Sequence, residues 1–459
     1  MYNTQRPEAS FISSKKPFQT FAVSDFYITK TELDPEVTKS PFIFGSSTKS
    51  PSVSPSEFPQ TPLSFSDVIS KPLSLPWATK PEHQTSLLAD QLVQYDIKSQ
   101  DPAHFVNMTV FYKESPDVLA ALPQHFLPVY KSFCWYNKDE NFLCLPSVYI
   151  AGFPKCGTTD FYSKLVWHPE FVKPAHSKEY FYWSRSRLGK RKTFVQPGDG
   201  KYESFTEFAA SFGGKALILD TNNTKGRLVD GSQNIMWDQI GWKDRNPGAN
   251  MPPYSYADVI HGITPHAKVI VLVRDPVERL YSEYLFLDFV KQRRLRQKTG
   301  VSRDSFGQEV AEDTARFQQC LETNTLEHCC FEQKEGGILR IYIGVYICYL
   351  KDWYELFTDN IFILFLDDYS RNPLDSMLEV YNFMGAALPN INELQTFIFN
   401  SKIANSRRKN EADKGDMSDE TRILLRNFYR PFNQQLAEYF NNSKFLFYDH
   451  RSINDKVVL

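Results

Sequence analysis

The sequence predicts an α/β protein with a P-loop-like central parallel β-sheet flanked by helices, and two observations lead to this fold class. Short, continuous apolar runs alternate along the chain with helical patterns. Such runs are typical of parallel strands that are covered on both faces. One run also ends in a glycine-containing turn that leads directly into a helix, and parallel sheets bind their ligands beyond the carboxyl ends of the strands.

Four strands are predicted from the apolar runs, at residues 147–151, 215–220, 268–274 and 361–366. The third run is the strongest, because Lys268 and Arg274 enclose five consecutive aliphatic residues. Helices are predicted at residues 158–168, 277–297 and 419–440, and from about residue 373. Pro276 precedes the second helix, and proline is favoured at a helix start. The apolar stretch 338–357 is expected to form a buried helix and not a membrane span, since charged residues interrupt it.

The first hundred residues differ in composition from the rest of the chain. Eight prolines lie between Pro41 and Pro81, in a stretch rich in serine and threonine. Prolines at this density remove backbone donors and prevent long helices. We therefore expect a largely disordered arm or stalk over residues 1–100, for which a small β domain is the alternative. A lead-in segment at 101–133 and a folded domain at 134–450 are expected to follow.

Overall charge and cysteine content limit the possible functions. The chain has 52 Lys and Arg against 54 Asp and Glu, a net charge of −2, which argues against a dedicated nucleic-acid binder. Its 7 cysteines are too few for a small disulfide scaffold, and their odd number leaves at least one thiol unpaired or joined to another chain. We find no secretory signal, no membrane anchor and no convincing cluster of metal ligands. The oligomeric state stays open.

Residues 152–159, Gly-Phe-Pro-Lys-Cys-Gly-Thr-Thr, are typical of a loop that binds phosphate. Gly152 and Gly157 allow a sharp turn and a close approach of the backbone to a ligand. The start of the following helix presents unpaired N–H groups to an anion, and Lys155 adds a positive charge. The loop is not a Walker A loop, because no Gly-Lys-[Ser/Thr] occurs, and this disfavours a Mg²⁺-dependent kinase. A plain glycine turn with an exposed lysine is the alternative.

A second motif, residues 273–284, begins where the strongest predicted strand ends. Arg274 stands at the carboxyl end of that strand, and arginine is suited to bidentate contacts with phosphate. Ser282 lies two helical turns further on and is expected to share the same ligand. The alternative is that Arg274 and Asp275 form an ion pair that caps the helix.

Together, the two motifs resemble the nucleotide-binding motifs of Golgi carbohydrate sulfotransferases, and the closest match is the group of N-acetylgalactosamine 4-sulfate 6-O-sulfotransferases. Further matching stretches are residues 178–179, 232–238, 404–408 and 425–433. The resemblance implies that residues 134–450 form a catalytic domain with the sulfotransferase fold. It also implies that the enzyme takes its sulfuryl group from 3′-phosphoadenosine 5′-phosphosulfate (PAPS) and needs no metal. The residues expected to bind PAPS are Lys155, Cys156, Gly157, Thr158 and Thr159 in the first motif, Arg274 and Ser282 in the second, and Arg407 and Arg408 in a later basic loop.

Two residues are expected to act in catalysis. Lys155 would neutralise the charge that grows on the leaving phosphate oxygen as the S–O bond breaks. Glu179 matches the glutamate that serves as the base in related heparan-type enzymes, so it would take the proton of the acceptor hydroxyl. An exposed glutamate that pairs with a basic neighbour is the alternative. The group usually carries Lys-Glu-Pro-His at this point, whereas Tyr180 and Phe181 follow Glu179 in this chain. We expect this departure to affect the choice of acceptor more than the activity.

The acceptor that the resemblance implies is a glycosaminoglycan, sulfated at the 6-hydroxyl of N-acetylgalactosamine (4-sulfate) in chondroitin or dermatan sulfate. A heparan-type or other carbohydrate sulfotransferase is one alternative, and a catalytically degenerate member that binds glycan or nucleotide is another. Family members are type II membrane proteins, so the resemblance places this domain in the Golgi lumen. Glycosylation sequons at Asn107, Asn222 and Asn441 favour a secretory route only weakly.

Two disulfide bonds are expected, and reduced cysteines in a cytosolic protein are the alternative. Cys134 is expected to pair with Cys144, and Cys320 with either Cys329 or Cys330, in a segment where related enzymes carry a disulfide. Cys156, inside the phosphate loop, is expected to stay free. Basic clusters at residues 190–192 and 291–298 could attract an acidic polysaccharide, although a solvated helix face explains the second cluster equally well.

Overall fold

The computed structural model of the chain describes residues 108–173, 177–188, 204–221, 226–294, 302–332, 339–402, 404 and 413–447, without the side chains of 215–221 and 290–294. In this part of the chain, five parallel strands form a central sheet in the order β4-β5-β3-β6-β7. The strands are β3 (Val148–Gly152), β4 (Phe171–Val172), β5 (Arg227–Asp230), β6 (Lys268–Val273) and β7 (Ile361–Phe365). The predicted fold class is confirmed, and the predicted arm at 1–100 lies outside the described residues.

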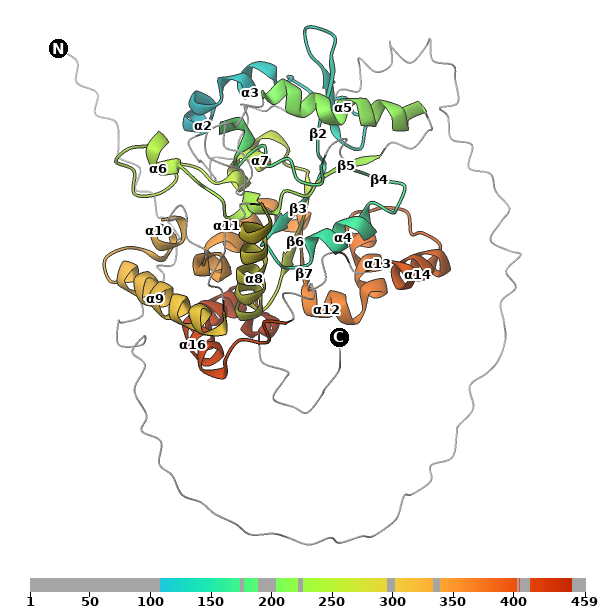
Figure 1. Ribbon diagram of the computed structural model, residues 1–459. Coiled ribbons are helices and arrows are strands. Elements are labelled where there is room, and N and C mark those ends of the chain that lie inside the picture. The colour runs from blue at the N-terminus through green and yellow to red at the C-terminus, as the bar shows by residue number, and fades with distance from the viewer. Residues whose placement is uncertain are drawn as a thin grey trace, which may run out of the picture. The chain divides into compact units, whose positions relative to one another are not determined.

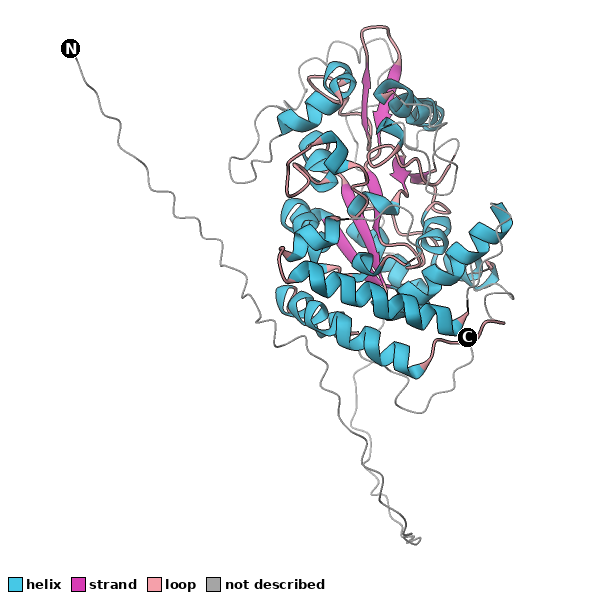
Figure 2. Ribbon diagram, turned by 60° about the vertical axis from the view of Figure 1, so that its left-hand side comes forward, coloured by secondary structure: helices cyan, strands magenta, loops and turns pink. Residues whose placement is uncertain are grey.

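Helices lie on both faces of the sheet (Figures 1 and 2). One layer contains α4 (Thr158–Leu165), α12 (Leu366–Arg371), α13 (Pro373–Phe383) and α14 (Ile391–Asn400). Buried tyrosines tie this layer together, since Tyr369 donates to Asp160 at 2.7 Å and Tyr381 donates to the carbonyl of Lys164 at 3.2 Å. The other layer contains α7 (Tyr256–Ile263), α8 (Pro276–Arg294), α9 (Arg303–Leu321), α10 (Leu326–Phe331), α11 (Ile347–Phe357) and α16 (Asp419–Tyr439).

The pair of strands β3 and β6 forms the centre of the sheet. They run in register from Val148 opposite Lys268 to Gly152 opposite Leu272, and their apolar side chains are buried on both faces. Gly152 has a φ of 117°, and an added Cβ would lie 2.9 Å from the carbonyl oxygen of Leu272. A side chain at this position would therefore push the two strand ends apart, just where the chain leaves the sheet.

Most of the predicted elements are confirmed. The runs at 147–151, 268–274 and 361–366 are β3, β6 and β7, and the helices predicted at 158–168, 277–297, 373 and 419–440 are α4, α8, α13 and α16. The stretch 338–357 contains a 3₁₀ turn at Ile341–Gly344 and the buried helix α11.

The strand predicted at 215–220 is wrong, because these residues belong to helix α5 (Phe205–Thr221). The earlier part of α5 presents buried rings at Phe205, Phe208 and Phe212. Phe208 stacks on Tyr182, with ring centroids 4.2 Å apart. Tertiary packing of this aromatic face favours the helix over the local strand propensity of the following aliphatic residues. The strand that lies beside β3 on the side away from β6 is β5, which has only two apolar residues, Leu228 and Val229.

A β-hairpin and two short helices precede the sheet. Strands β1 (Phe133–Tyr136) and β2 (Phe142–Leu145) pair antiparallel and are joined by the predicted Cys134–Cys144 disulfide. Helices α2 (Met108–Glu114) and α3 (Pro116–Ala121) lie in the lead-in segment. They are held by the buried Arg187, which donates to Ser115 at 2.7 Å and to Tyr254 at 2.8 Å. This part of the lead-in segment is thus packed against the α/β domain.

The remaining cysteines follow the expectation. Cys320 pairs with Cys329, one of the two predicted alternatives, and Cys156, Cys330 and Cys348 are free and buried. Two sequon asparagines, 107 and 222, lie outside the described residues. Asn441 is exposed directly after α16. None of the helices among the described residues is both long and apolar enough to cross a membrane.

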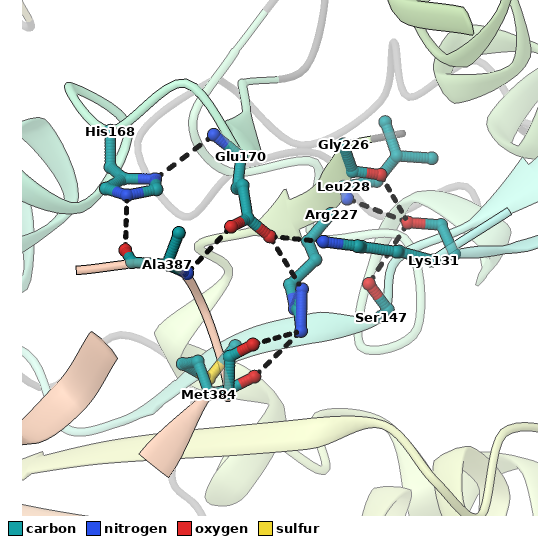
Figure 3. A network of polar contacts seen from close by, with 11 residues as sticks. Lys131, Ser147, His168, Glu170, Gly226, Arg227, Leu228, Met384 and Ala387 are labelled. Carbon is teal, nitrogen blue, oxygen red and sulfur yellow. Dashed lines mark hydrogen bonds and ion pairs between the residues drawn. The ribbon is translucent and has the colours of Figure 1, made fainter. Parts of the chain in front are cut away.

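A network of ion pairs and hydrogen bonds closes the amino edge of the sheet, where β3, β4 and β5 begin (Figure 3). The carboxylate of Glu170 accepts from Lys131 at 2.5 Å, from Arg227 at 3.2 Å and from the backbone N–H of Ala387 at 2.8 Å. The ring of His168 contacts the carbonyl of Ala387 at 2.8 Å and accepts from the N–H of Glu170 at 3.1 Å. This network joins β4 and β5 to the turn between α13 and α14.

Candidate functional site

The predicted phosphate loop connects β3 to α4 at the carboxyl edge of the sheet. Gly157 is the N-cap of α4 in the left-handed conformation, with a φ of 79°, and an added Cβ would lie 2.6 Å from the side chain of Leu366. Lys155 is also left-handed, with a φ of 67°. Consecutive turns of this kind direct backbone N–H groups to one side, and the N-terminus of α4 adds further donors beside Thr158 and Thr159. The loop is therefore built to receive an anion.

The loop and the second motif contact each other. The guanidinium of Arg274 donates to the carbonyl of Lys155 at 3.2 Å. The ammonium of Lys155 lies 4.4 Å from the ring centroid of Phe286 on α8. Ser282 is four residues before Phe286 and thus lies on the same face of that helix. These contacts place Arg274 next to Lys155, and Lys155 beside the face of α8 that carries Ser282.

Asp275 does not pair with Arg274 in the way that the alternative interpretation of this motif required. It caps α8 by accepting from the N–H of Val277 at 2.9 Å, and it pairs with Arg426 of α16 at 2.8 Å. Burial raises the pKa of Asp275, although the guanidinium of Arg426 acts against this. Because Arg426 supplies the partner of Asp275, Arg274 is directed to the phosphate loop. Arg426 belongs to one of the weaker matching stretches, and nothing local in the sequence indicates this contact.

Glu179 lies next to the phosphate loop. The ammonium of Lys178 donates both to Thr158 of the loop and to the Glu179 carboxylate, each at 3.0 Å. The side chain of Glu179 keeps 26% of its accessible surface, so it can still meet a ligand. The two predicted catalytic residues, Lys155 and Glu179, thus belong to the same edge of the sheet.

Asp230, at the end of β5, is a buried carboxylate that the sequence analysis missed. Its Oδ1 accepts from the N–H and the hydroxyl of Ser232, at 2.9 and 2.6 Å, whereas its Oδ2 is buried and has no hydrogen-bond partner. Burial raises the pKa of Asp230 to about 6; the Ser232 hydrogen bonds and Lys178 lower it, while Glu179 raises it. Because strand β5 is not predicted from the sequence, Asp230 cannot be placed at the end of a strand. The only local signal for a turn here is the Asp-Gly-Ser sequence that follows Val229.

Two backbone contacts join the segment around Glu179 to the turn after β5. The N–H of Gly231 donates to the carbonyl of Lys178, and the N–H of Phe181 donates to the hydroxyl of Ser232, both at 2.9 Å. Tyr180 is buried, and its ring centroid lies 5.1 Å from that of Phe212 in α5. Tyr180, one of the two residues that depart from the Lys-Glu-Pro-His pattern, is thus part of the aromatic core.

Cys156 faces the interior beneath the phosphate loop. Burial raises the pKa of its thiol to about 12, although the guanidinium groups of Arg279 and Arg274 act against this. The thiol is therefore protonated and unreactive at neutral pH. Arg279 itself is buried and pairs with Glu283 at 2.8 Å, and Arg340 also pairs with Glu283. The side of the loop that faces the protein interior is consequently occupied by the Cys156 thiol, with the ion pairs of Glu283 nearby.

The described residues contain no group of three or more His, Cys, Asp or Glu side chains suited to a metal ion. Arg407 and Arg408 lie outside the described residues, as do the basic residues 190–192 and 295–298. The preceding Ala404 is described, and its N–H donates to Asp160 in the first turn of α4 at 2.9 Å. The chain thus passes the phosphate loop shortly before it reaches these two arginines.

Comparisons with known proteins agree on the family. A model described as "Sulfotransferase family" matches residues 146–332, and one described as "Sulfotransferase domain" matches residues 255–435. Carbohydrate sulfotransferase 15 of Rattus norvegicus is 30% identical over 389 residues, which is 72% of this chain and 67% of the relative. The Homo sapiens protein of the same name is 30% identical over 387 residues, or 71% and 66%. The chain thus spans about two thirds of the length of the curated relatives it matches.

Solved structures include a sulfotransferase from Alicyclobacillus acidocaldarius, with 18% identity and a TM-score of 0.42. The matched part covers 66% of this chain and 98% of that protein.

Proposed function

This chain belongs to the carbohydrate sulfotransferase family, and we propose that it transfers a sulfuryl group from PAPS to a glycosaminoglycan. The acceptor that we propose is the 6-hydroxyl of N-acetylgalactosamine 4-sulfate in chondroitin or dermatan sulfate. One observation supports this function most strongly. Lys178 joins the carboxylate of Glu179 to Thr158 of the phosphate loop by two contacts of 3.0 Å. A base beside an anion-binding loop is what sulfuryl transfer to a hydroxyl requires.

The donor site that we propose has two parts. The first motif, with Lys155, Cys156, Gly157, Thr158 and Thr159, binds the 5′-phosphosulfate, with Cys156 contributing its backbone since its thiol is buried. Arg274 and Ser282 hold the 3′-phosphate, and Arg407 and Arg408 close over the nucleotide. The contact of Arg274 with the Lys155 carbonyl supports this arrangement, because it holds the two anion-binding motifs next to each other.

The chemistry follows from these positions. The acceptor oxygen forms a bond to sulfur while the bond between sulfur and the bridging phosphate oxygen breaks. Glu179 takes the proton of the acceptor hydroxyl, and the charge that remains on the phosphate oxygen is neutralised by Lys155. The ring of Phe286, 4.4 Å from the Lys155 ammonium, supports this role because a cation is favoured over an aromatic face. The proposed reaction needs no metal.

The compartment that we propose is the Golgi lumen. The disulfides Cys134–Cys144 and Cys320–Cys329 support it, since disulfides persist in oxidising compartments. A heparan-type acceptor is the second candidate. Tyr180 and Phe181 stand where the chondroitin group carries Pro-His and so leave the acceptor open, and the acceptor profile distinguishes the two candidates.

The function is tested by transfer of labelled sulfate from PAPS to desulfated chondroitin, 4-sulfated chondroitin, dermatan sulfate and desulfated heparan. We expect the highest rate with the 4-sulfated chondroitin-type chains. Lys155→Ala should lower kcat at least about 100-fold, as the loss of an oxyanion-stabilising group does. Lys243→Ala is the matched control, because Lys243 is half-exposed and pairs with Glu332, and it should leave transfer unchanged.

Each possible failure of this test has a separate meaning. Folded protein that binds 3′-phosphoadenosine 5′-phosphate (PAP) but sulfates none of the four acceptors would refute the proposed acceptor class. A preference for desulfated heparan would establish the second candidate. Lack of PAP binding would refute the donor site itself.

A further inference from the structure

We propose that Lys178 is a positioning residue that holds the carboxylate of Glu179 at the phosphate loop, and that Gly231 provides the space for it. This inference rests on the proposed function, because it concerns how the base and the donor loop are kept together. In the sequence, Lys178 is notable only as part of the dipeptide 178–179 that matches the family. The structure shows it between the two halves of the site.

The ammonium of Lys178 is shared between two partners from different elements. It donates to Thr158 at the start of α4 and to Glu179 in the loop after β4, at 3.0 Å in both cases. The side chain of Lys178 retains only 14% of its accessible surface. Since a lysine ammonium has three donors, one group can serve both partners at the same time. The distance between the base and the phosphate loop is thus set by one side chain.

The charges around Lys178 explain why a cation is needed there. Asp230 lies at the end of the neighbouring strand β5, and its carboxylate and that of Glu179 interact unfavourably, whereas Lys178 interacts favourably with Asp230. The ring of Tyr162 lies 6.0 Å from the ammonium. Without the positive charge, Glu179 would lose its link to Thr158 and would be repelled by Asp230. The expected result is a carboxylate turned away from the reacting atoms.

Gly231 accommodates the stem of Lys178. An added Cβ at Gly231 would lie 2.8 Å from Cγ and 2.9 Å from Cε of Lys178, and 3.1 Å from its carbonyl oxygen. The stem cannot simply move aside at its base, because the N–H of Gly231 donates to that same carbonyl at 2.9 Å. An alanine at position 231 should therefore displace the Lys178 side chain without removing any charge.

The test compares Lys178→Met, which keeps the length of the stem but removes the ammonium, with Gly231→Ala, which keeps the ammonium but fills its space. We expect each variant to lower kcat about 100-fold, the usual cost of a misplacement of about 1 Å. We expect the affinity for PAP, measured by calorimetry, to change less than about 5-fold. Gly214→Ala is the matched control, because nothing lies within 4 Å of an added Cβ at that helical glycine. It should behave like the unchanged protein.

Double variants distinguish positioning from a general loss of structure. If Lys178 acts through Glu179, Lys178→Met added to Glu179→Gln should cost no more than about 3-fold beyond the single Glu179 variant. Adding Gly231→Ala to Lys178→Met should likewise lower kcat only slightly further. Losses that multiply in both cases would overturn the proposal. So would single variants that keep kcat within about 3-fold, or a loss confined to the affinity for PAP, which would make Lys178 a donor-binding residue.

A crystal structure gives a readout that does not depend on activity. We expect the Lys178–Thr158 contact to persist in the unchanged protein and to be lost in Gly231→Ala. A Gly231→Ala protein that retains the contact would refute the role of Gly231. Unchanged protein that shows the contact but transfers no sulfate would refute the proposed function and leave this arrangement standing.

Discussion

At the amino edge of the sheet, the carboxylate of Glu170 accepts from an ammonium, a guanidinium and a backbone N–H (Figure 3). At the carboxyl edge, Asp230 has one oxygen that is buried without a hydrogen-bond partner, and Glu179 depends on an ammonium that it shares with Thr158. Both edges are rich in charge, but only the amino edge has each of its central carboxylate oxygens paired. Of these carboxylates, the incompletely paired one, Asp230, thus lies at the edge where the proposed reaction takes place.

The pKa shifts reflect the same difference. Burial tends to raise the pKa of Glu170, but the hydrogen bonds from Lys131 and Ala387 and the nearby cations lower it overall. Burial dominates at Asp230 and raises its pKa to about 6. Carboxylates with a strongly shifted pKa are typical of functional sites, whereas the removal of one partner from a paired carboxylate destabilises the fold. Substitutions at the two edges should therefore differ in their effect on activity, and their effects on stability should depend on pH in opposite ways.

The largest expected effect is the loss of activity in Glu179→Gln. The amide keeps the shape of the side chain and can still accept from Lys178, but it cannot take a proton. We expect kcat to fall about 10²- to 10⁴-fold, as is usual for the loss of a general base. The affinity for PAP and the midpoint of thermal unfolding should stay nearly constant. Transfer at the unchanged rate would show that another group is the base.

The sequence predicts the central part of this site because its signals are local. The apolar runs of β3 and β6, the two glycines and Lys155 all lie within short segments, and so does the motif that begins at Arg274. Each can be interpreted without knowing which residues are close in space. The loop between β3 and α4 and the two strands β3 and β6 therefore lie where the sequence predicts them.

Residues that act through distant contacts leave no such signal. Strand β5 has two apolar residues, whereas residues 215–220 of α5 have four, so the local pattern favours the wrong segment. Helix α5 forms because Phe205, Phe208 and Phe212 pack against rings near residue 182. Once β5 is misplaced, Asp230 and Gly231 cannot be related to Lys178, about 50 positions earlier in the chain. Contacts of this range are set by the fold and not by local pattern.

A second prediction uses the opposite pH dependence of the two edges. Asp230 has a pKa of about 6 in the folded protein against 3.8 for the ordinary side chain. The folded state thus binds this proton more tightly, and the contribution of Asp230 to stability falls as the pH rises through this range. Asp230→Asn removes the penalty, so it should gain up to about 3 kcal/mol relative to the unchanged protein between pH 4 and pH 7.

Urea unfolding at several pH values measures this difference. The amino edge should behave in the opposite way, because the pKa of Glu170 is lowered by its donors despite burial, and burial lowers the pKa of His168. The contribution of each of these two groups to the stability of the folded protein therefore decreases as the pH falls. Curves of Asp230→Asn and the unchanged protein that stay parallel from pH 4 to pH 7 would contradict the assignment of a raised pKa to Asp230.

The smallest expected effect is a loss of stability without a loss of activity in Glu170→Gln. Glu170 keeps 16% of its side-chain surface exposed, so solvent screening reduces the cost of breaking its ion pairs. We expect the free energy of unfolding to fall by about 2 kcal/mol, because Lys131 and Arg227 lose their charged partner. Since the network lies at the amino edge, kcat of the folded protein should stay within about 2-fold. A fall in kcat as large as that of Glu179→Gln, with normal PAP binding, would mean that the two edges are coupled through β5, and the separation of stability from function between them would be wrong.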